Sequence, residues 1–188
     1  MVTTVNADTI VGGAVVTADA SGSLGLQSAG TTAITLTSGN TTIAQKLTAV
    51  GTSSIAGMKI ADVLETATIS ATAATGTINY DVTTQAVLYY TTNASANWTV
   101  NFRGSSGTSL NTLMATGESI TVAFLVTQGG TAYYNNAVQV DGASVTPKYQ
   151  GGTAWSAGNA SSIDVYSYVI VKTGSAAFTI FASQTKFA

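Results

Sequence analysis

The residues that enzymes use most often for catalysis are absent from this chain or stand alone. It contains neither histidine nor cysteine. Histidine is the commonest general base and metal ligand, and cysteine supplies thiolates, so Ser-His-Asp catalysis, Cys-His catalysis and ordinary zinc sites are excluded. Among the carboxylates, only Asp62 and Glu65 are close in sequence, and their spacing is more typical of a solvated helix face than of a catalytic pair. We therefore expect no enzyme activity, no metal and no cofactor.

The glycine-containing motifs are better explained by turns than by ligand binding. Asp141 followed by Gly142 is part of a calcium-loop pattern, but the repeated Asp or Asn positions of such loops are missing. Between apolar residues, this pair is typical of a tight β-hairpin. The stretches SLGLQS and GGTAWSAG match no phosphate-binding loop followed by a helix.

Six aromatic side chains remain as candidates for binding a ligand or a neighbouring subunit. They are Tyr89, Tyr90, Tyr133, Tyr134, Tyr149 and Trp155. Four of them form two tyrosine doublets on predicted strands. Because consecutive side chains of a strand point to opposite faces, one ring of each doublet should leave the core.

The other two candidates, Tyr149 and Trp155, belong to a long loop predicted over residues 147–161, PKYQGGTAWSAGNAS. Loops of this length that keep aromatic residues are often functional, and rings flanked by amides suit stacking on sugars or docking on a neighbouring subunit. The alternative is that Trp155 folds back over the edge of the fold or packs across a subunit interface.

The strongest structural signal is the stretch of residues 97–128. Residues 97–103 alternate between large apolar and polar side chains, which is the period of a half-buried strand. A helical turn follows, with Ser109 as its N-cap and Gly117 as its C-terminal stop. Residues 119–128 then form the longest apolar strand of the chain. This stretch predicts the centre of a β-sandwich.

After residue 66 the sequence predicts a series of strands separated by turns rich in Gly, Asn and Asp. The predicted strands are residues 68–71, 77–82, 86–92, 97–103, 119–128, 131–135, 137–140, 145–149, 162–173 and 177–187. The last two should form a long hairpin. Roughly eight to ten antiparallel strands with one helical turn predict an all-β fold, with a C-terminal antiparallel β-sandwich that is jelly-roll-like.

Aromatic residues are distributed very unevenly along the 188 residues. All fifteen of them (five Phe, two Trp and eight Tyr) lie at or after Tyr80. Since aromatic side chains bury the largest areas, only the C-terminal part should assemble a conventional core. Residues 1–66 are typical of short strands of small residues, which bury too little area to order a single chain. We predict a β-rich oligomerising region at residues 1–66 and the sandwich domain at residues 67–188.

The chain carries very little charge. Charged residues make up 7 % of it, against about 25 % in an average protein. With a net charge of −2 and six scattered basic residues, the sequence has no electrostatic footprint for nucleic acid or an anionic membrane. No apolar run approaches the roughly 18 residues of a membrane-spanning helix, so we expect no membrane insertion. A surface with so little charge has little self-repulsion and tends to associate, which favours a protein that works inside an assembly.

Two stretches resemble a known family. Residues 4–39, which begin TVNADTIVGGAVV, look like the opening of many virion structural and tail-fibre-like proteins of tailed bacteriophages, especially marine ones. Residues 88–187, which begin LYYTTNASANWTVNF, are similar to a domain that follows such openings. Related modules are found on head fibres, capsid knobs and tail fibres alike. The resemblance implies a virion protein and brings no catalytic residues with it.

Our leading hypothesis is a non-enzymatic virion structural protein, a short fibre or knob on the surface of a tailed phage. It would assemble in the host cytoplasm as a homotrimer and attach to other capsid or tail proteins through residues 1–66. One alternative is a capsid decoration (cement) protein whose N-terminal region clamps neighbouring capsomers. Another is a module that binds host surface glycans through the candidate aromatic residues.

Overall fold

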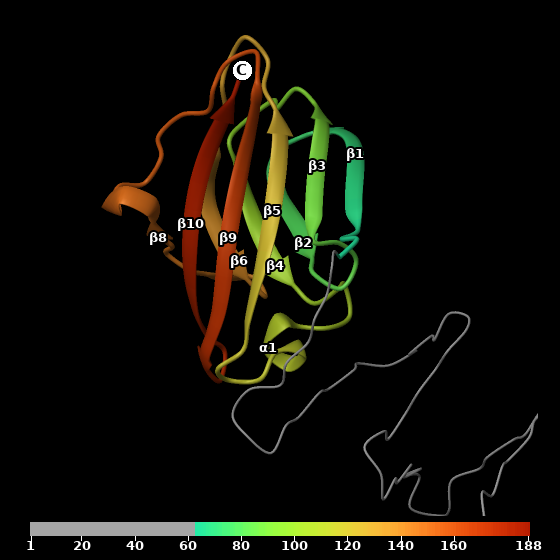
Figure 1. Cartoon of the computed structure of the whole chain (residues 1–188), viewed down its shortest axis with the longest axis vertical. Coiled ribbons are helices and arrows are strands. Elements are labelled where there is room, and N and C mark those ends of the chain that lie inside the picture. Colours follow the sequence, from blue (N-terminus) through green and yellow to red (C-terminus); the bar gives the residue numbers. More distant parts are fainter. Residues whose placement is uncertain (1–62) are drawn as a thin grey trace, which may run out of the picture. The chain divides into compact units, whose positions relative to one another are not determined.

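Residues 63–188 are the part of the chain that the structure, a computed structural model, describes, and they fold as a sandwich of two β-sheets (Figure 1). The six-stranded sheet contains, in spatial order, β1 (Ala67–Ala73), β3 (Val87–Thr92), β5 (Ser119–Thr127), β9 (Ile163–Gly174), β10 (Ala177–Phe187) and β8 (Lys148–Tyr149). The four-stranded sheet contains β2 (Gly76–Asp81), β4 (Trp98–Arg103), β6 (Asn135–Val140) and β7 (Ala143–Ser144). The predicted all-β fold class is confirmed.

The chain crosses from one sheet to the other after each of its first strands. From β1 to β6, the odd-numbered strands join the six-stranded sheet and the even-numbered strands join the four-stranded sheet. Within each sheet these strands run parallel, β1 beside β3 beside β5 and β2 beside β4 beside β6. A strand of the opposite sheet thus serves as the crossover that parallel neighbours require. The antiparallel pair β9 and β10 then extends the larger sheet.

The prediction of an antiparallel, jelly-roll-like sandwich is therefore only partly right. Antiparallel pairing joins β5 to β9, β9 to β10 and β6 to β7, and the long C-terminal hairpin is confirmed. The other pairs are parallel, whereas a jelly roll is built from antiparallel strands. The error has a physical reason: alternation with period two indicates which side chains face the core, but not the direction of the neighbouring strand.

The link between β1 and β2 illustrates how a short loop changes sheets. Only Ala74 and Thr75 separate the two strands, a length that in a hairpin joins antiparallel neighbours. Here Ala74 is fully buried in the core. Gly76 follows with a φ of +60°, a conformation that glycine adopts without steric cost. The chain therefore turns inward and continues in the opposite sheet.

Most strands lie within one or two residues of their predicted positions, and the differences concentrate in two segments. Of residues 131–135, only Asn135 is in a strand, as the first residue of β6. The backbone N–H and C=O of Tyr133 are bound instead by the side-chain amide of Gln128, at 3.0 and 2.7 Å. The predicted strand at residues 145–149 is reduced to the two residues of β8.

The α-helical turn α1 (Leu110–Leu113) begins as predicted, with Ser109 as its N-cap, and a second turn, the 3-10 helix η1, spans Gln150–Gly152. α1 ends at Met114 rather than at the glycine predicted to stop it. At this end the ammonium group of Lys172 donates hydrogen bonds to the carbonyl oxygens of Asn111 and Met114, the second at 2.8 Å. A cation placed at a helix C-terminus satisfies carbonyl groups that have no partner within the helix.

The turn predicted at Asp141-Gly142 is observed between β6 and β7, and both residues have positive φ, +51° and +83°. The carboxylate of Asp141 also accepts hydrogen bonds from the N–H groups of Leu110 and Asn111, at 2.7 and 2.9 Å. Asp141 therefore has two structural roles. It forms the turn between β6 and β7, and its carboxylate caps the start of α1.

The two sheets meet across a layer of large aromatic rings. Trp98 and Phe102 come from β4, Phe124 from β5, and Tyr166 and Tyr168 from β9, and each is at most 1 % exposed. The centroid of the Trp98 ring system lies 5.9 Å from that of Phe124 and 5.6 Å from that of Tyr166, while the centroids of Phe102 and Tyr168 are 4.9 Å apart. All three contacts are edge-to-face, the geometry that aromatic pairs prefer. The two strands of the stretch 97–128 thus lie in opposite sheets and meet through Trp98 and Phe124.

The predicted N-terminal region lies, up to residue 62, outside the described residues, and its oligomerising role stays a prediction. The chain divides into two units, and the described residues belong to the second, Ile60–Ala188. β1 begins at Ala67, the first residue of the predicted sandwich domain. Within residues 63–188 no helix has the length and apolar character needed to cross a membrane.

Replacing Phe124 with alanine should lower the free energy of unfolding by about 3–5 kcal/mol, because it removes a fully buried ring that contacts Tyr90 and Trp98. Denaturant titration of the full chain measures this loss. Thr121→Ala is the matched control, since Thr121 is an exposed residue of the same strand, and it should change stability by about 0.5 kcal/mol or less. Equal effects of the two substitutions would contradict the assigned core.

Candidate functional site

In each tyrosine doublet, one ring packs against the core and the other does not. Tyr90 meets Phe124 edge to face, with 5.4 Å between ring centroids, and Tyr133 also packs on the core. Tyr89 and Tyr134 are half-buried and lie outside the core cluster. Within residues 63–188 no ring contact joins one doublet to the other, so the structure does not bring the four tyrosines into one site.

Tyr149 and Trp155, in contrast, are brought together with two buried tyrosines of β9. The Trp155 ring meets Tyr149 at 4.8 Å, Tyr166 at 5.1 Å and Tyr168 at 6.4 Å between centroids. We call these four residues the side cluster. Trp155 therefore folds back onto the sandwich, which is one of the alternatives that the sequence left open.

The indole of Trp155 is also held by a hydrogen bond, because its Nε1–H donates to the carbonyl oxygen of Asn135. Asn135 is 2 % exposed, and its own amide donates to the carbonyl oxygens of Trp98 and Ala137, at 2.9 and 2.8 Å. The Tyr168 hydroxyl donates to Asn135 Oδ1 at 3.0 Å. The side cluster is thus anchored to β6 through one buried amide.

Burial fixes the protonation of these tyrosines. It raises the pKa of Tyr168 well above its usual value, and it also raises the pKa values of Tyr166 and Tyr149. For Tyr166, the negative charge of Asp164 adds to the effect. These hydroxyls therefore stay neutral hydrogen-bonding groups at physiological pH, which suits packing and positioning rather than proton transfer.

A small hollow of about 210 Å³ lies beside the side cluster and combines Trp155 with amide and hydroxyl groups. Its walls are Gln150, Gly151, Thr153, Trp155, Ala182, Ser183 and Gln184. A second hollow of about 530 Å³ adjoins it and has Lys148, Tyr149 and Phe181 among its walls. Aromatic side chains next to hydroxyl and amide groups are typical of small-molecule sites, and such a combination suits a sugar.

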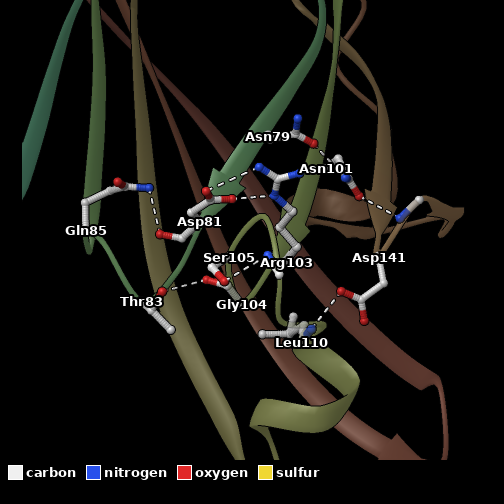
Figure 2. Close-up of polar contacts among 12 residues, drawn as sticks. Asn79, Asp81, Thr83, Gln85, Asn101, Arg103, Gly104, Ser105, Leu110 and Asp141 are labelled. Atoms are coloured by element: carbon white, nitrogen blue, oxygen red, sulfur yellow. Dashed lines mark hydrogen bonds and ion pairs between the residues drawn. The ribbon is translucent and has the colours of Figure 1, made fainter.

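On the outer side of the four-stranded sheet, polar side chains pair with one another across parallel strands, as Figure 2 shows. The guanidinium of Arg103 binds the carboxylate of Asp81, and this contact raises the pKa of Arg103. Asn101 Nδ2 donates to Asn79 Oδ1 at 2.8 Å, and Asn101 Oδ1 accepts from the Gly142 N–H at 2.8 Å. Parallel strands in register stack these residues, so the pairs stabilise the sheet face.

Asp164 is the one buried carboxylate among the described residues, with 0 % of its surface exposed. Its Oδ2 accepts hydrogen bonds from Gln128 Nε2 at 2.9 Å and from the Asn159 N–H at 3.0 Å, whereas Oδ1 has no partner. Gly158 lies so close that an added Cβ would come within 2.6 Å of Oδ2 and 2.3 Å of the Tyr133 carbonyl oxygen. Asp164 thus joins the loop after β5 to the loop before β9.

Sequence reasoning missed this buried network and the role of Lys172, although one signal pointed to both. In β9, IDVYSYVIVKTG, every second residue from Asp164 to Lys172 is buried. The alternation therefore placed a carboxylate and an ammonium group on the same side of the strand as Tyr166 and Tyr168, but it did not by itself say that this side faces the core. What the alternation could not supply was the identity of their partners, which come from other loops and from α1.

Among residues 63–188, no group of three or more Asp, Glu, His or Cys side chains could hold a metal ion. Comparisons of the chain with protein-family models, with curated proteins and with solved structures find no match. The candidate site therefore has two parts, the side cluster with its hollow and the buried Asp164 network.

The pH dependence of stability should reveal Asp164. Burial raises its pKa above the ordinary value of 3.8, against the opposing effects of its hydrogen bonds and of Lys186. A carboxyl with a raised pKa in the folded state contributes stability that is fully present below pH 3.8 and is lost as pH rises through its folded-state pKa. Over that window the wild type should lose stability relative to Asp164→Asn, by at most about 1.4 kcal/mol per pH unit.

Denaturant titrations of both proteins at a series of pH values measure this difference. Ser167→Ala, on the outward side of the same strand, is the matched control, because it removes no ionisable group and its difference from the wild type should not vary with pH. A difference between wild type and Asp164→Asn that stays constant with pH, or that grows in the opposite direction, would rule out the assigned environment of Asp164.

Proposed function

We propose that this chain is a non-enzymatic structural protein of a virion surface, a short fibre or knob of a tailed bacteriophage that works as a homotrimer. Residues 1–66 would attach it to capsid or tail proteins, and the sandwich would face outward. The proposal begins from the resemblance of residues 4–39 and 88–187 to virion structural proteins.

The charged side chains support the non-enzymatic part of the proposal, because they bind backbone and side-chain groups of the fold itself. Asp141 and Lys172 bind the backbone at the two ends of α1. Asp164 binds the amide of Gln128 and a loop N–H, and Arg103 pairs with Asp81. Groups that could do chemistry are thus engaged in holding loops and strands in place, which is the pattern of a scaffold.

Localisation on the particle tests this proposal directly. Gold-labelled antibodies against this chain should decorate the surface of particles produced by a phage that encodes it. Quantitative mass spectrometry of the purified particles gives the copy number, because a few dozen chains indicate a fibre or knob and several hundred indicate a decoration protein. Absence of the chain from purified particles would refute a virion role.

A second candidate function, recognition of a host surface glycan, is favoured by the 210 Å³ hollow beside Trp155. The exposed residues Gln150 and Thr153 line the hollow together with Trp155 and bring an amide and a hydroxyl to it. This arrangement supports binding through the rim of the hollow, since most of the Trp155 ring is occupied by contacts within the side cluster.

Glycan binding should therefore depend on the rim of the hollow rather than on Trp155 alone. The double variant Gln150→Ala with Thr153→Ala should weaken binding to a recognised bacterial polysaccharide by about tenfold or more, since each lost hydrogen bond costs on the order of 1 kcal/mol. Thr77→Ala with Thr99→Ala, on the other sheet, is the control and should bind normally. Failure of the wild type to bind any polysaccharide of the host would eliminate this candidate.

A further inference from the structure

The outward positions of β1, β3, β5, β9 and β10 form one continuous face, which we call the outer face. Strand register aligns its side chains in rows across the sheet. Two of these rows are Ile69-Tyr89-Leu125-Val165 and Thr121-Val169-Phe181. Apart from hydroxyl groups, the rows are apolar, and in Figure 1 the five strands lie side by side without a helix drawn over them.

Most of the exposed large apolar side chains lie on this face. Within residues 63–188 there are seven such side chains, and four of them belong to the outer face: Ile69, Val169, Phe181 and Phe187, which are 62, 37, 50 and 53 % exposed. The other three lie before β1 or in α1, so within the described part the outer side of the four-stranded sheet has none. Soluble proteins rarely expose apolar side chains in one continuous patch unless the patch has a partner.

The outer face also lacks charge. β1, β3 and β5 contain no charged residue at all. On β9, Asp164 and Lys172 point inward and are buried, and on β10, Lys186 aligns with Asp164 on the inward side. Lys148, on the short β8, stands at the border of the face.

The size of the outer face is that of a protein interface. Five strands about 4.8 Å apart and about nine residues long, at about 3.3 Å per residue, cover about 700 Å². A stable protein–protein interface buries about 800 Å² per partner, which is close to this footprint.

We propose that the outer face packs against the same face of further copies of this chain. A face without charge meets neither like-charge repulsion nor an unpaired buried charge when it is brought against itself, whereas a charged partner would have to bury its charges without compensation. The inference rests on the proposed function in one respect, namely that copies of the chain assemble with one another. It adds the surface by which the sandwich domains meet, a surface separate from residues 1–66.

Cysteine labelling of the full chain tests whether the outer face is covered and by what. Because the chain has no cysteine, Ser167→Cys introduces one thiol in the middle of the outer face, in register with Ala123 and Ser183. Ser144→Cys places the control thiol on the exposed β7 strand of the other sheet. Maleimide labelling rates are measured from nanomolar to high micromolar concentration, together with the molar mass by light scattering.

The Ser167→Cys thiol should label about tenfold or more slowly once the chain is associated, as mass action requires, while the Ser144→Cys thiol labels equally fast throughout. Adding Leu125→Glu to Ser167→Cys should restore fast labelling, because the new carboxylate lies on the same face, in a row without charged residues, and would be buried unpaired. Ala137→Glu, on the exposed side of β6, adds the same charge to the other sheet and should leave slow labelling unchanged.

Each other outcome overturns the proposal. Fast labelling of an associated chain means that copies meet elsewhere and leaves the virion role intact. Slow labelling of a monomeric chain means that the chain covers its own face. If Leu125→Glu fails to fold, as judged by circular dichroism, Val169→Thr exchanges one methyl group of the face for a hydroxyl at nearly constant shape, and an onset of slow labelling at the same concentration as in the wild type refutes the interface. Loss of gold label from particles, in contrast, would refute the virion role without bearing on the labelling result.

Discussion

The whole structure depends on one constraint: two sheets must share a single layer of large rings. Trp98, Phe124 and Tyr166 fill that layer edge to face, and a sandwich of this kind leaves about 10 Å between the sheets. Each strand must therefore turn one row of alternate side chains toward this layer. On β9 the inward side runs through two charged residues, Asp164 and Lys172. Burying a charge without partners costs several kcal/mol, so the rest of the chain must bring polar groups to both ends of this strand.

The loops and α1 are the parts that meet this requirement. At one end of β9, Gln128 and the Asn159 N–H approach Asp164. At the other end, Lys172 binds the carbonyl groups of α1, whose start is fixed by Asp141. A four-residue helix has little stability of its own, so its charged partners at both ends explain why it forms here. Trp155 is held in a similar way. Its ring packs against Tyr166, and its indole N–H donates a hydrogen bond to the carbonyl oxygen of Asn135 in β6.

Local patterns in the sequence were sufficient to place the strands, because alternation, caps and turns act over a few residues. The N-cap at Ser109 and the turn at Asp141-Gly142 are examples in which residue type alone determined the backbone. The parallel order of β1, β3 and β5 was not predictable in this way, since it depends on which sheet the two-residue link at Ala74 enters. The Asp164 network and the position of Trp155 depend on contacts between residues far apart in sequence, for which alternation gives only the direction of the side chain.

The parallel stacking has different consequences on the two outer sides of the sandwich. On the four-stranded sheet it aligns Asn79 with Asn101 and Asp81 with Arg103, so the polar groups satisfy one another within one chain and the surface needs no partner. On the six-stranded sheet it aligns apolar side chains. These have no polar groups to pair with one another, and they gain free energy when they are removed from water. If copies pack through the outer face as proposed, the larger sheet turns toward other copies and the smaller sheet toward solvent. The 530 Å³ hollow, whose walls include Lys148, Val169 and Phe181, lies at the edge of the outer face, and it shares Gln150, Ala182 and Ser183 with the smaller hollow beside Trp155. The proposed self-association and the proposed glycan binding therefore meet at the border between β10 and β8, where a packed copy and a bound glycan would compete for these shared residues.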